Sequence, residues 1–178
     1  MYYIAIIAPE AINAQVLIWK RFMRDRFSCV VALKSPAHIT LVNPFWLDSN
    51  LEHLLVSELE SYSNTQKRFQ LELKDFNSFQ PRVIFVHVVA SPDLTQVSRG
   101  IYEQLVNKGF PIKNRTSHFY PHITIANRDL LKKDFNTAWD HFKNKKYKAS
   151  FEVIGITLMK LNSMQWEAAH TAAFPHTN

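Results

Sequence analysis

The sequence is poor in glycine and cysteine, and both shortages exclude classes of site. Its 178 residues include three glycines, Gly100, Gly109 and Gly155, which are too few for a glycine-rich phosphate loop or a dinucleotide-binding fingerprint. The single cysteine, Cys29, excludes an internal disulfide and a zinc site built from several cysteines. One free thiol is typical of a reducing compartment, so we expect a cytoplasmic protein.

Long apolar runs are also missing. No stretch approaches the roughly 20 apolar residues that a membrane span needs. The first ten residues, "MYYIAIIAPE", have no basic region before their apolar part and no evident cleavage site. We therefore expect a soluble chain with no membrane partner. With 47% hydrophobic and 13% aromatic residues, the chain can fill the core of one ordinary domain.

The charge is moderately positive. Twenty-one Lys and Arg against 15 Asp and Glu give a formal net charge of +6, which favours polyanionic partners such as nucleic acid or phosphorylated metabolites. Much of the excess lies in "KGFPIKNR" at 108–115 and in "KNKKYK" at 143–148. A solvated surface is the simpler interpretation of such runs, so charge alone does not define the function.

The order of apolar patterns repeats along the chain. The first half has strand patterns at 2–8, 38–42 and 69–76, separated by helical patterns at 12–27 and 51–62. The second half has strand patterns at 82–90, 122–126 and 149–161, separated by helices that Ser91 and Asp129 are expected to cap. We predict one bilobal domain over 1–178, with βαβαβ repeats at approximately 1–77 and 81–161 and a C-terminal strand at 164–174.

Two short motifs occupy equivalent places in these halves. They are His38-Ile39-Thr40-Leu41 within "SPAHITLVNP" and His122-Ile123-Thr124-Ile125 within "FYPHITIANR". Side chains at positions i and i+2 share one face of a strand, so each histidine projects with its threonine while the apolar residues enter the core. A lone strand histidine is usually structural, but a matched pair in duplicated halves favours a function.

The paired motifs suit chemistry at a phosphate diester. If the halves pack about a pseudo-twofold axis, two hydroxyls can donate to non-bridging oxygens, one neutral imidazole can accept a proton from the nucleophile, and one imidazolium can protonate the leaving oxygen. Histidine's unperturbed pKa of about 6.5 permits both roles near neutrality. A zinc site using His118 and His122 is disfavoured, because Pro121 between them opposes the helix that this spacing requires.

The motifs resemble the hallmark of the two-histidine phosphoesterase superfamily, which includes bacterial 2′-5′ RNA ligase-like proteins and 2′,3′-cyclic nucleotide phosphodiesterases. The resemblance extends to "HITLVNPF" (38–45) and "FNSFQPRVIFVHV" (76–88), and it covers the chain from Met1 to about Leu161. It implies an α/β (α+β) bilobal fold with antiparallel-rich sheets lining a central groove and helices outside. It also implies chemistry without a metal or other cofactor, in which His38 and His122 are the acid and base and Thr40 and Thr124 hold the phosphate.

One position departs from the family pattern. Many members carry a basic residue where Asn127 stands, whereas this chain has Arg128 one place later. On a continuing strand that shift turns the side chain to the other face, so Arg128 reaches the phosphate only if the strand ends or bulges at Asn127. Phe119 and Tyr120 are candidates for stacking on a base, although packing is the commoner role, and Arg115 is a further candidate for substrate contact.

The sequence therefore predicts an enzyme, a phosphoesterase that acts on the 2′,3′-cyclic phosphate or 2′-5′ phosphodiester of RNA or nucleotides, by hydrolysis or by reversible ligation. Two alternatives stay open: a non-catalytic RNA- or nucleotide-binding module, and a phosphodiesterase for a small cyclic phosphate metabolite. No obligate protein partner is evident, so a monomer is expected.

Overall fold

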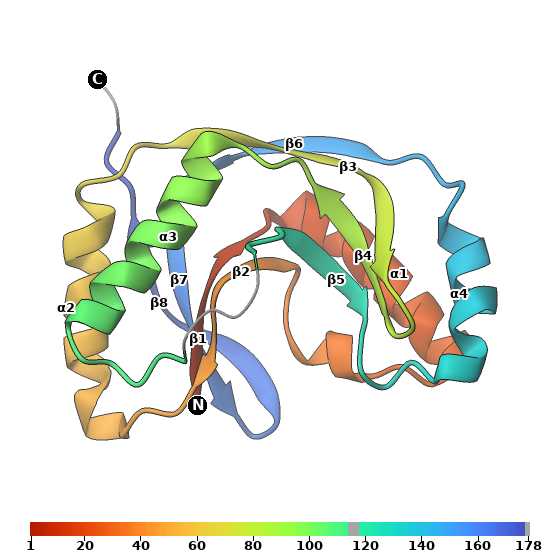
Figure 1. Ribbon diagram of the computed structural model, residues 1–178, viewed down its shortest axis with the longest axis horizontal. Helices are drawn as coiled ribbons and strands as arrows, with labels where there is room; N and C mark the ends of the chain where they lie inside the picture. Colours follow the sequence, from red (N-terminus) through yellow and green to blue (C-terminus); the bar gives the residue numbers. More distant parts are fainter. Residues whose placement is uncertain (114–117, 177–178) are drawn as a thin grey trace.

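The computed structural model describes residues 1–113 and 118–176 and has two lobes (Figure 1). Within these residues the strands form two four-stranded sheets, with the orders β2-β1-β7-β8 and β5-β4-β3-β6, and every neighbouring pair is antiparallel. The strands are β1 Tyr2–Ile7, β2 His38–Phe45, β3 Phe69–Phe79, β4 Val83–Val88, β5 His122–Ala126, β6 Lys148–Val153, β7 Gly155–Asn162 and β8 Gln165–Ala173.

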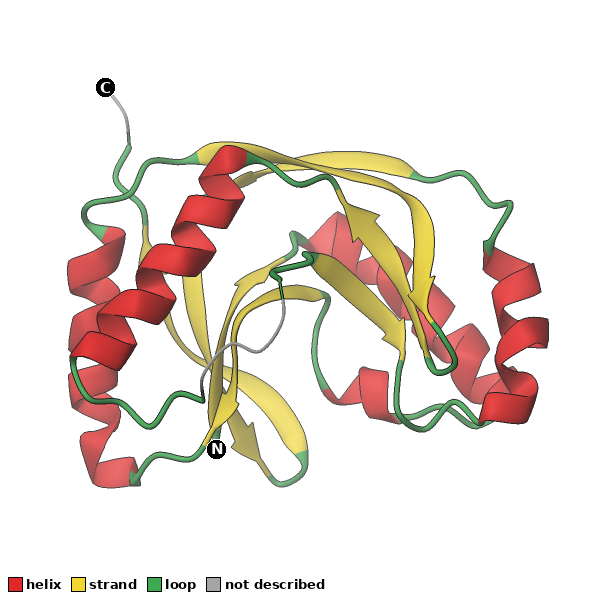
Figure 2. Ribbon diagram, in the orientation of Figure 1, coloured by secondary structure: helices red, strands yellow, loops and turns green. Residues whose placement is uncertain are grey.

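The helices lie outside the sheets (Figure 2). They are α1 Glu10–Phe27, α2 Glu52–Ser63, α3 Pro92–Asn107 and α4 Phe135–Phe142, with short 3₁₀ turns η1 Val31–Lys34, η2 Ser49–Leu51 and η3 Lys132–Asp134. The α3 helix begins as its sequence predicts, since the backbone N–H of Leu94 donates to the Ser91 hydroxyl at 3.1 Å. The mixed fold with antiparallel sheets and a central groove is confirmed. In the described part of the chain, no helix is both long enough and apolar enough to cross a membrane.

Each of the two sheets contains strands from both halves of the chain. The β3 strand, from the first half, pairs with β4 and β6, whereas β7, from the second half, pairs with β1. The helices follow the same exchange, because α1 packs against β5 and α3 packs against β2. Each lobe is therefore assembled from both halves, a feature that the repeated element order does not reveal, and the predicted repeats at 1–77 and 81–161 stay a prediction.

Two local expectations are wrong. The apolar run at 149–161 is not one strand but β6 and β7 in different sheets, and the exposed Ile154 lies at the break between them. Asp129 does not cap α4, since that helix begins at Phe135 after the η3 turn. The Asp129 carboxylate instead accepts hydrogen bonds from the backbone N–H groups of Val30 and Val31, at 2.6 and 2.7 Å, just before η1.

Both motifs lie on edge strands, and these edges contact each other where the lobes meet. The β2 strand ends one sheet and β5 ends the other. Along β2 and β5 the isoleucines and leucine of the motifs are buried, whereas each histidine and threonine stays partly exposed. The alternation expected from strand geometry is therefore present at both motifs, and it turns their polar faces toward the space between the lobes.

Candidate active site

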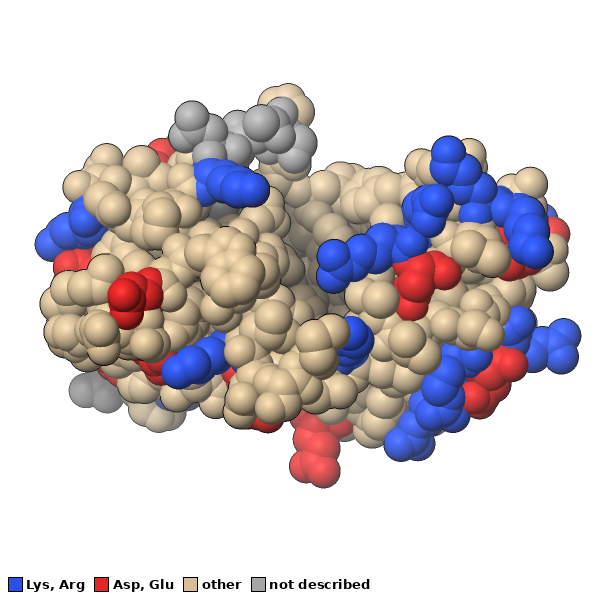
Figure 3. Space-filling model, turned by 90° about the horizontal axis from the view of Figure 1, so that it is seen from below, with Lys and Arg blue, Asp and Glu red and all other residues tan. Residues whose placement is uncertain are grey.

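A cavity of about 180 Å³ brings residues of both motifs together. Its lining includes His38 and Thr40 from β2, Thr124 from β5, and Arg128 from the loop that follows β5. Seen from below, the surface is hollowed between the lobes, and lysine and arginine side chains stand along the rim on the lobe that contains α1 and α4 (Figure 3). The hollow thus presents hydroxyl, imidazole and guanidinium groups to a single ligand.

His122 lies beside this cavity and does not line it. Its ring contacts the rings of Phe79 and Phe85, with centroids 5.4 and 5.0 Å away. Its charged form makes a small contribution to lowering the pKa of His38, so the two imidazoles are near enough to interact electrostatically. His122 thus lies near the motif residues that line the cavity.

Both imidazoles are oriented in the same way. His38 Nδ1 lies 2.8 Å from the carbonyl oxygen of Pro36, and His122 Nδ1 lies 2.7 Å from that of Tyr120. A carbonyl oxygen can only accept, so Nδ1 is the protonated nitrogen in both rings. In each lobe Nε2 is left as the nitrogen that can take or give a proton.

The two histidines differ in their surroundings. Burial, reinforced by the charges of Lys20 and His122, lowers the pKa of His38 to about 4, although the hydrogen bond to the Pro36 carbonyl opposes this shift. Burial also lowers the pKa of His122 below its ordinary value of 6.5, opposed by the Tyr120 carbonyl. Both rings are therefore neutral at pH 7, and His38 resists protonation chiefly because it is buried, with a smaller contribution from the charge of Lys20.

The end of β5 decides the position of Arg128. The strand stops at Ala126, and the backbone N–H of Leu130 donates to the Asn127 carbonyl at 2.7 Å, which turns the chain. Arg82 Nη1 fixes the turn further by donating to the Arg128 carbonyl at 2.8 Å. The one-residue shift therefore does not carry Arg128 to the opposite face, and its side chain lines the cavity with His38 and the threonines.

The two aromatic residues predicted to contact a base, Phe119 and Tyr120, differ in their exposure. Tyr120 is 41% exposed beside His122, and its ring lies 5.3 Å from that of Phe79 in an edge-to-face arrangement. Phe119 is partly buried and packs against the core. Tyr120 is thus the better placed of the two to meet a ligand, while Arg115 lies outside the described residues.

Several lining residues were not predicted from the sequence. Tyr3 lies under His38 with ring centroids 5.0 Å apart and meets Trp166 edge to face at 4.6 Å. Burial raises the pKa of Tyr3, which keeps its phenol neutral, and Ser35 opposes that shift. Asn127 lines the cavity too, and its buried Oδ1 accepts no hydrogen bond from the described residues.

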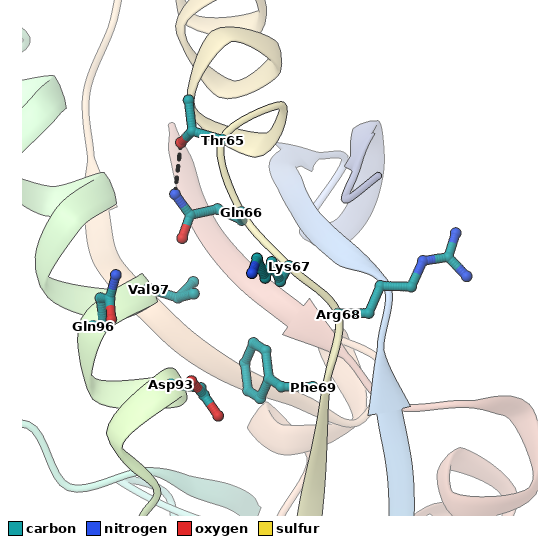
Figure 4. Close-up of a pocket in the computed structure, with 8 residues that line it drawn as sticks. All are labelled: Thr65, Gln66, Lys67, Arg68, Phe69, Asp93, Gln96 and Val97. Atoms are coloured by element: carbon teal, nitrogen blue, oxygen red, sulfur yellow. Dashed lines mark hydrogen bonds between the residues drawn. The ribbon is translucent and has the colours of Figure 1, made fainter. Parts of the chain in front are cut away.

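A larger cavity of about 300 Å³ lies elsewhere, between the chain that enters β3 and the start of α3 (Figure 4). Lys67 and Asp93 both line it, so it has no clear preference for one sign of charge, and the side chain of Arg68 points away. It contains no residue of either motif. Within residues 1–113 and 118–176, no group of three or more His, Cys, Asp or Glu side chains is arranged to hold a metal ion.

Two lobes that each bring a His-x-Thr-x strand to one groove are the arrangement expected of the two-histidine phosphoesterase superfamily. The model of the 2′-5′ RNA ligase superfamily matches residues 9–164, and the chain belongs to this family. A protein of Bacillus cytotoxicus named "Putative phosphoesterase" is 33% identical over 108 residues, which are 60% of this chain and 59% of that protein. The chain thus spans about three fifths of the length of such curated relatives.

Solved structures share the fold over nearly the whole chain. The crystal structure of TT0787 from Thermus thermophilus has a TM-score of 0.72 at 15% identity and covers 99% of both chains. That of Escherichia coli LigT complexed with 3′-AMP has a TM-score of 0.72 at 20% identity and covers 97% of both chains. These likenesses extend the assignment of the fold from the matched segment to the complete bilobal chain.

Proposed function

We propose that the protein is a metal-independent phosphoesterase that hydrolyses the 2′,3′-cyclic phosphate or 2′-5′ phosphodiester of RNA or nucleotides. One observation carries the proposal: a single cavity beside His122 is lined by His38 and Thr40 from one sheet, Thr124 from the other sheet, and Arg128 from the loop after β5. The family assignment supports the same chemistry. The single cysteine is typical of a reducing compartment, which supports a protein that acts in the cytoplasm.

In the proposed reaction the phosphate lies between the two histidines. The hydroxyls of Thr40 and Thr124 donate hydrogen bonds to its non-bridging oxygens, and Arg128 neutralises part of its charge. A water oxygen attacks phosphorus, its proton passes to one Nε2, and the bond from phosphorus to a ribose oxygen breaks as the other Nε2–H protonates that oxygen. Ligation is the same transfer with a ribose hydroxyl in place of water.

The surroundings of the histidines favour one assignment of roles. Burial lowers the pKa of His38 to about 4, and the charge of Lys20 adds to this shift, so His38 stays neutral and serves as the base that accepts the proton of water. The pKa of His122 is lowered without a comparable cation among its causes, so the charge of a bound phosphate readily favours its protonated form. His122 then serves as the acid that protonates the leaving ribose oxygen.

The direct test is turnover with metal ions removed. Purified protein in excess EDTA is expected to open a 2′,3′-cyclic nucleotide to a phosphomonoester. Chromatography of the products measures this turnover. Loss of turnover in EDTA with recovery on adding a divalent cation would contradict the proposed chemistry. Salt-sensitive RNA binding without turnover across a panel of cyclic phosphates would favour a binding module instead.

The pH dependence of kcat/KM follows from the two lowered pKa values. Activity rises as the pH increases through about 4, where His38 becomes the neutral base, and it falls as His122 loses the proton that the acid must carry. Because the pKa of His122 lies below 6.5, the optimum of kcat/KM is expected below that pH. Initial rates between roughly pH 4 and 8 at constant ionic strength measure it. An optimum above neutrality would contradict the lowered pKa values from which this profile is derived.

A further inference from the structure

A second cavity, of about 230 Å³, adjoins the first. The two cavities share Ser35 and Trp166 in their walls. The second is bounded by α1, by the segment that leads into β2, and by the start of β8. A ligand whose phosphate occupies the first cavity therefore has a neighbouring space into which another part of the same molecule can extend.

The lining of the second cavity is positively charged. It includes Lys20 and Lys34, the amides of Asn13 and Gln165, and no Asp or Glu. Asn13 already uses its side-chain oxygen to accept from the backbone N–H of Ala37 at 2.7 Å, so its NH₂ group remains as the donor. Cations and amide donors without a carboxylate are the groups that bind a phosphate.

Lys20 is the most informative member of this lining. Its residue surface is only 3% exposed, and burial lowers its pKa to about 8. Its Nζ donates to the Ser35 carbonyl at 2.9 Å, which accounts for one of the three N–H donors of an ammonium group. No ion pair involves Lys20 in the described parts of the chain. A buried ammonium without an anionic partner is costly, and a bound anion would supply that partner.

We propose that the second cavity is an anion subsite that binds a further phosphate of the substrate whose reacting phosphate lies in the first cavity. This inference rests on the proposed function and narrows its substrate class to ribonucleotides that carry another phosphate. That phosphate is either the 5′-phosphate of a mononucleotide or the preceding phosphodiester of an oligonucleotide. Both present the same non-bridging oxygens to Lys20, Lys34 and the Asn13 amide.

Three substrates separate the two sources of phosphate. They are a nucleoside 2′,3′-cyclic phosphate with a free 5′-hydroxyl, the same compound with a 5′-phosphate, and a dinucleotide that ends in the cyclic phosphate. We expect kcat/KM to be about tenfold higher for one or both phosphate-bearing substrates, and the excess to shrink as salt is raised. Preference for the second compound identifies a phosphomonoester, and preference for the dinucleotide alone identifies a phosphodiester.

Two variants connect this preference to the cavity. In Lys34→Ala and in Lys20→Met, which keeps an unbranched side chain without the charge, the ratio of kcat/KM values with and without the extra phosphate is expected to fall toward one. The matched control is Lys148→Ala, which removes an exposed lysine from β6, outside the lining of both cavities, and it should leave the ratio unchanged.

The test distinguishes failure of the subsite from failure of the proposed function. Equal kcat/KM for all three substrates would overturn the subsite while the phosphoesterase activity stands. If no substrate turns over, the proposed function fails, and Kd values of the same compounds for the wild-type protein, measured by calorimetry, decide the subsite. Equal Kd values overturn it in that case, and tighter binding of the phosphate-bearing compounds that Lys34→Ala abolishes supports it.

Discussion

Replacing His38 or His122 by alanine is expected to lower kcat for opening of a 2′,3′-cyclic phosphate by about 10²–10⁴-fold each. Each variant removes one of the two Nε2 atoms that move a proton in the proposed reaction, while the carbonyls of Pro36 and Tyr120 that orient the rings stay in place. Steady-state rates at saturating substrate measure the loss. The double variant should lose less than the product of the two effects, because groups that act in one step are not additive.

A matched control variant distinguishes loss of a catalytic group from loss of the folded structure. His53 lies on α2, away from both motifs and outside the lining of the cavity, so His53→Ala should retain wild-type rates. Circular dichroism and the thermal midpoint of His38→Ala and His122→Ala should show that both keep the fold. If both folded variants turned over at the wild-type rate, the two histidines would have no catalytic role.

The largest expected effect on stability belongs to Asp129→Ala. One oxygen of this carboxylate accepts the backbone N–H groups of both Val30 and Val31. Removing it leaves two donors without their acceptor, and the free energy of unfolding should fall by about 3 kcal/mol, since hydrogen bonds to charged groups contribute about 1.5–3 kcal/mol each. Because Val31 and Ser35 line the cavity in which we propose that the phosphate binds, KM should rise as well. Urea unfolding measures the first effect and initial rates the second.

Asp129→Asn is the matched variant for this prediction. Its side-chain oxygen can still accept both N–H groups, but without the negative charge, so about half of the lost stability should return. An Asp129→Ala protein as stable as the wild type would show that the carboxylate does not hold the chain before η1 in place.

The motif residues could be predicted because their signal is local. The period of two along a strand determines which side chains share a face, so the sequence alone indicated that Ile39 and Ile123 are buried and that each histidine projects with its threonine. The position of Arg128 could not be predicted in this way. It depends on the end of β5 at Ala126 and on the hydrogen bond from Arg82, and neither is visible in the motif itself.

The rest of the groove depends on contacts between distant parts of the chain. Tyr3 and Trp166 are separated by most of the sequence, and they meet because β1 pairs with β7, which pairs with β8. The burial of Lys20 is only weakly indicated by the sequence. Lys20 stands one helical turn after Val16 on the otherwise apolar face of α1. A lysine at such a position is a signal that the apolar periodicity alone does not interpret.

The exchange of strands between the halves has a consequence for synthesis of the protein. The segment 1–79, which is synthesised first, contains β1, β2 and β3. The β1 strand can pair with β2, but its other neighbour, β7, is synthesised much later, and β3 belongs to the other sheet. Tyr2 pairs with Lys160, so the sheet that contains His38 is completed only after β7 and β8 have left the ribosome. Folding from such distant partners is slow, because the entropy of closing a long loop is lost before the contacts form. The groove between the lobes is therefore expected to form only after residues 155–173 have been synthesised.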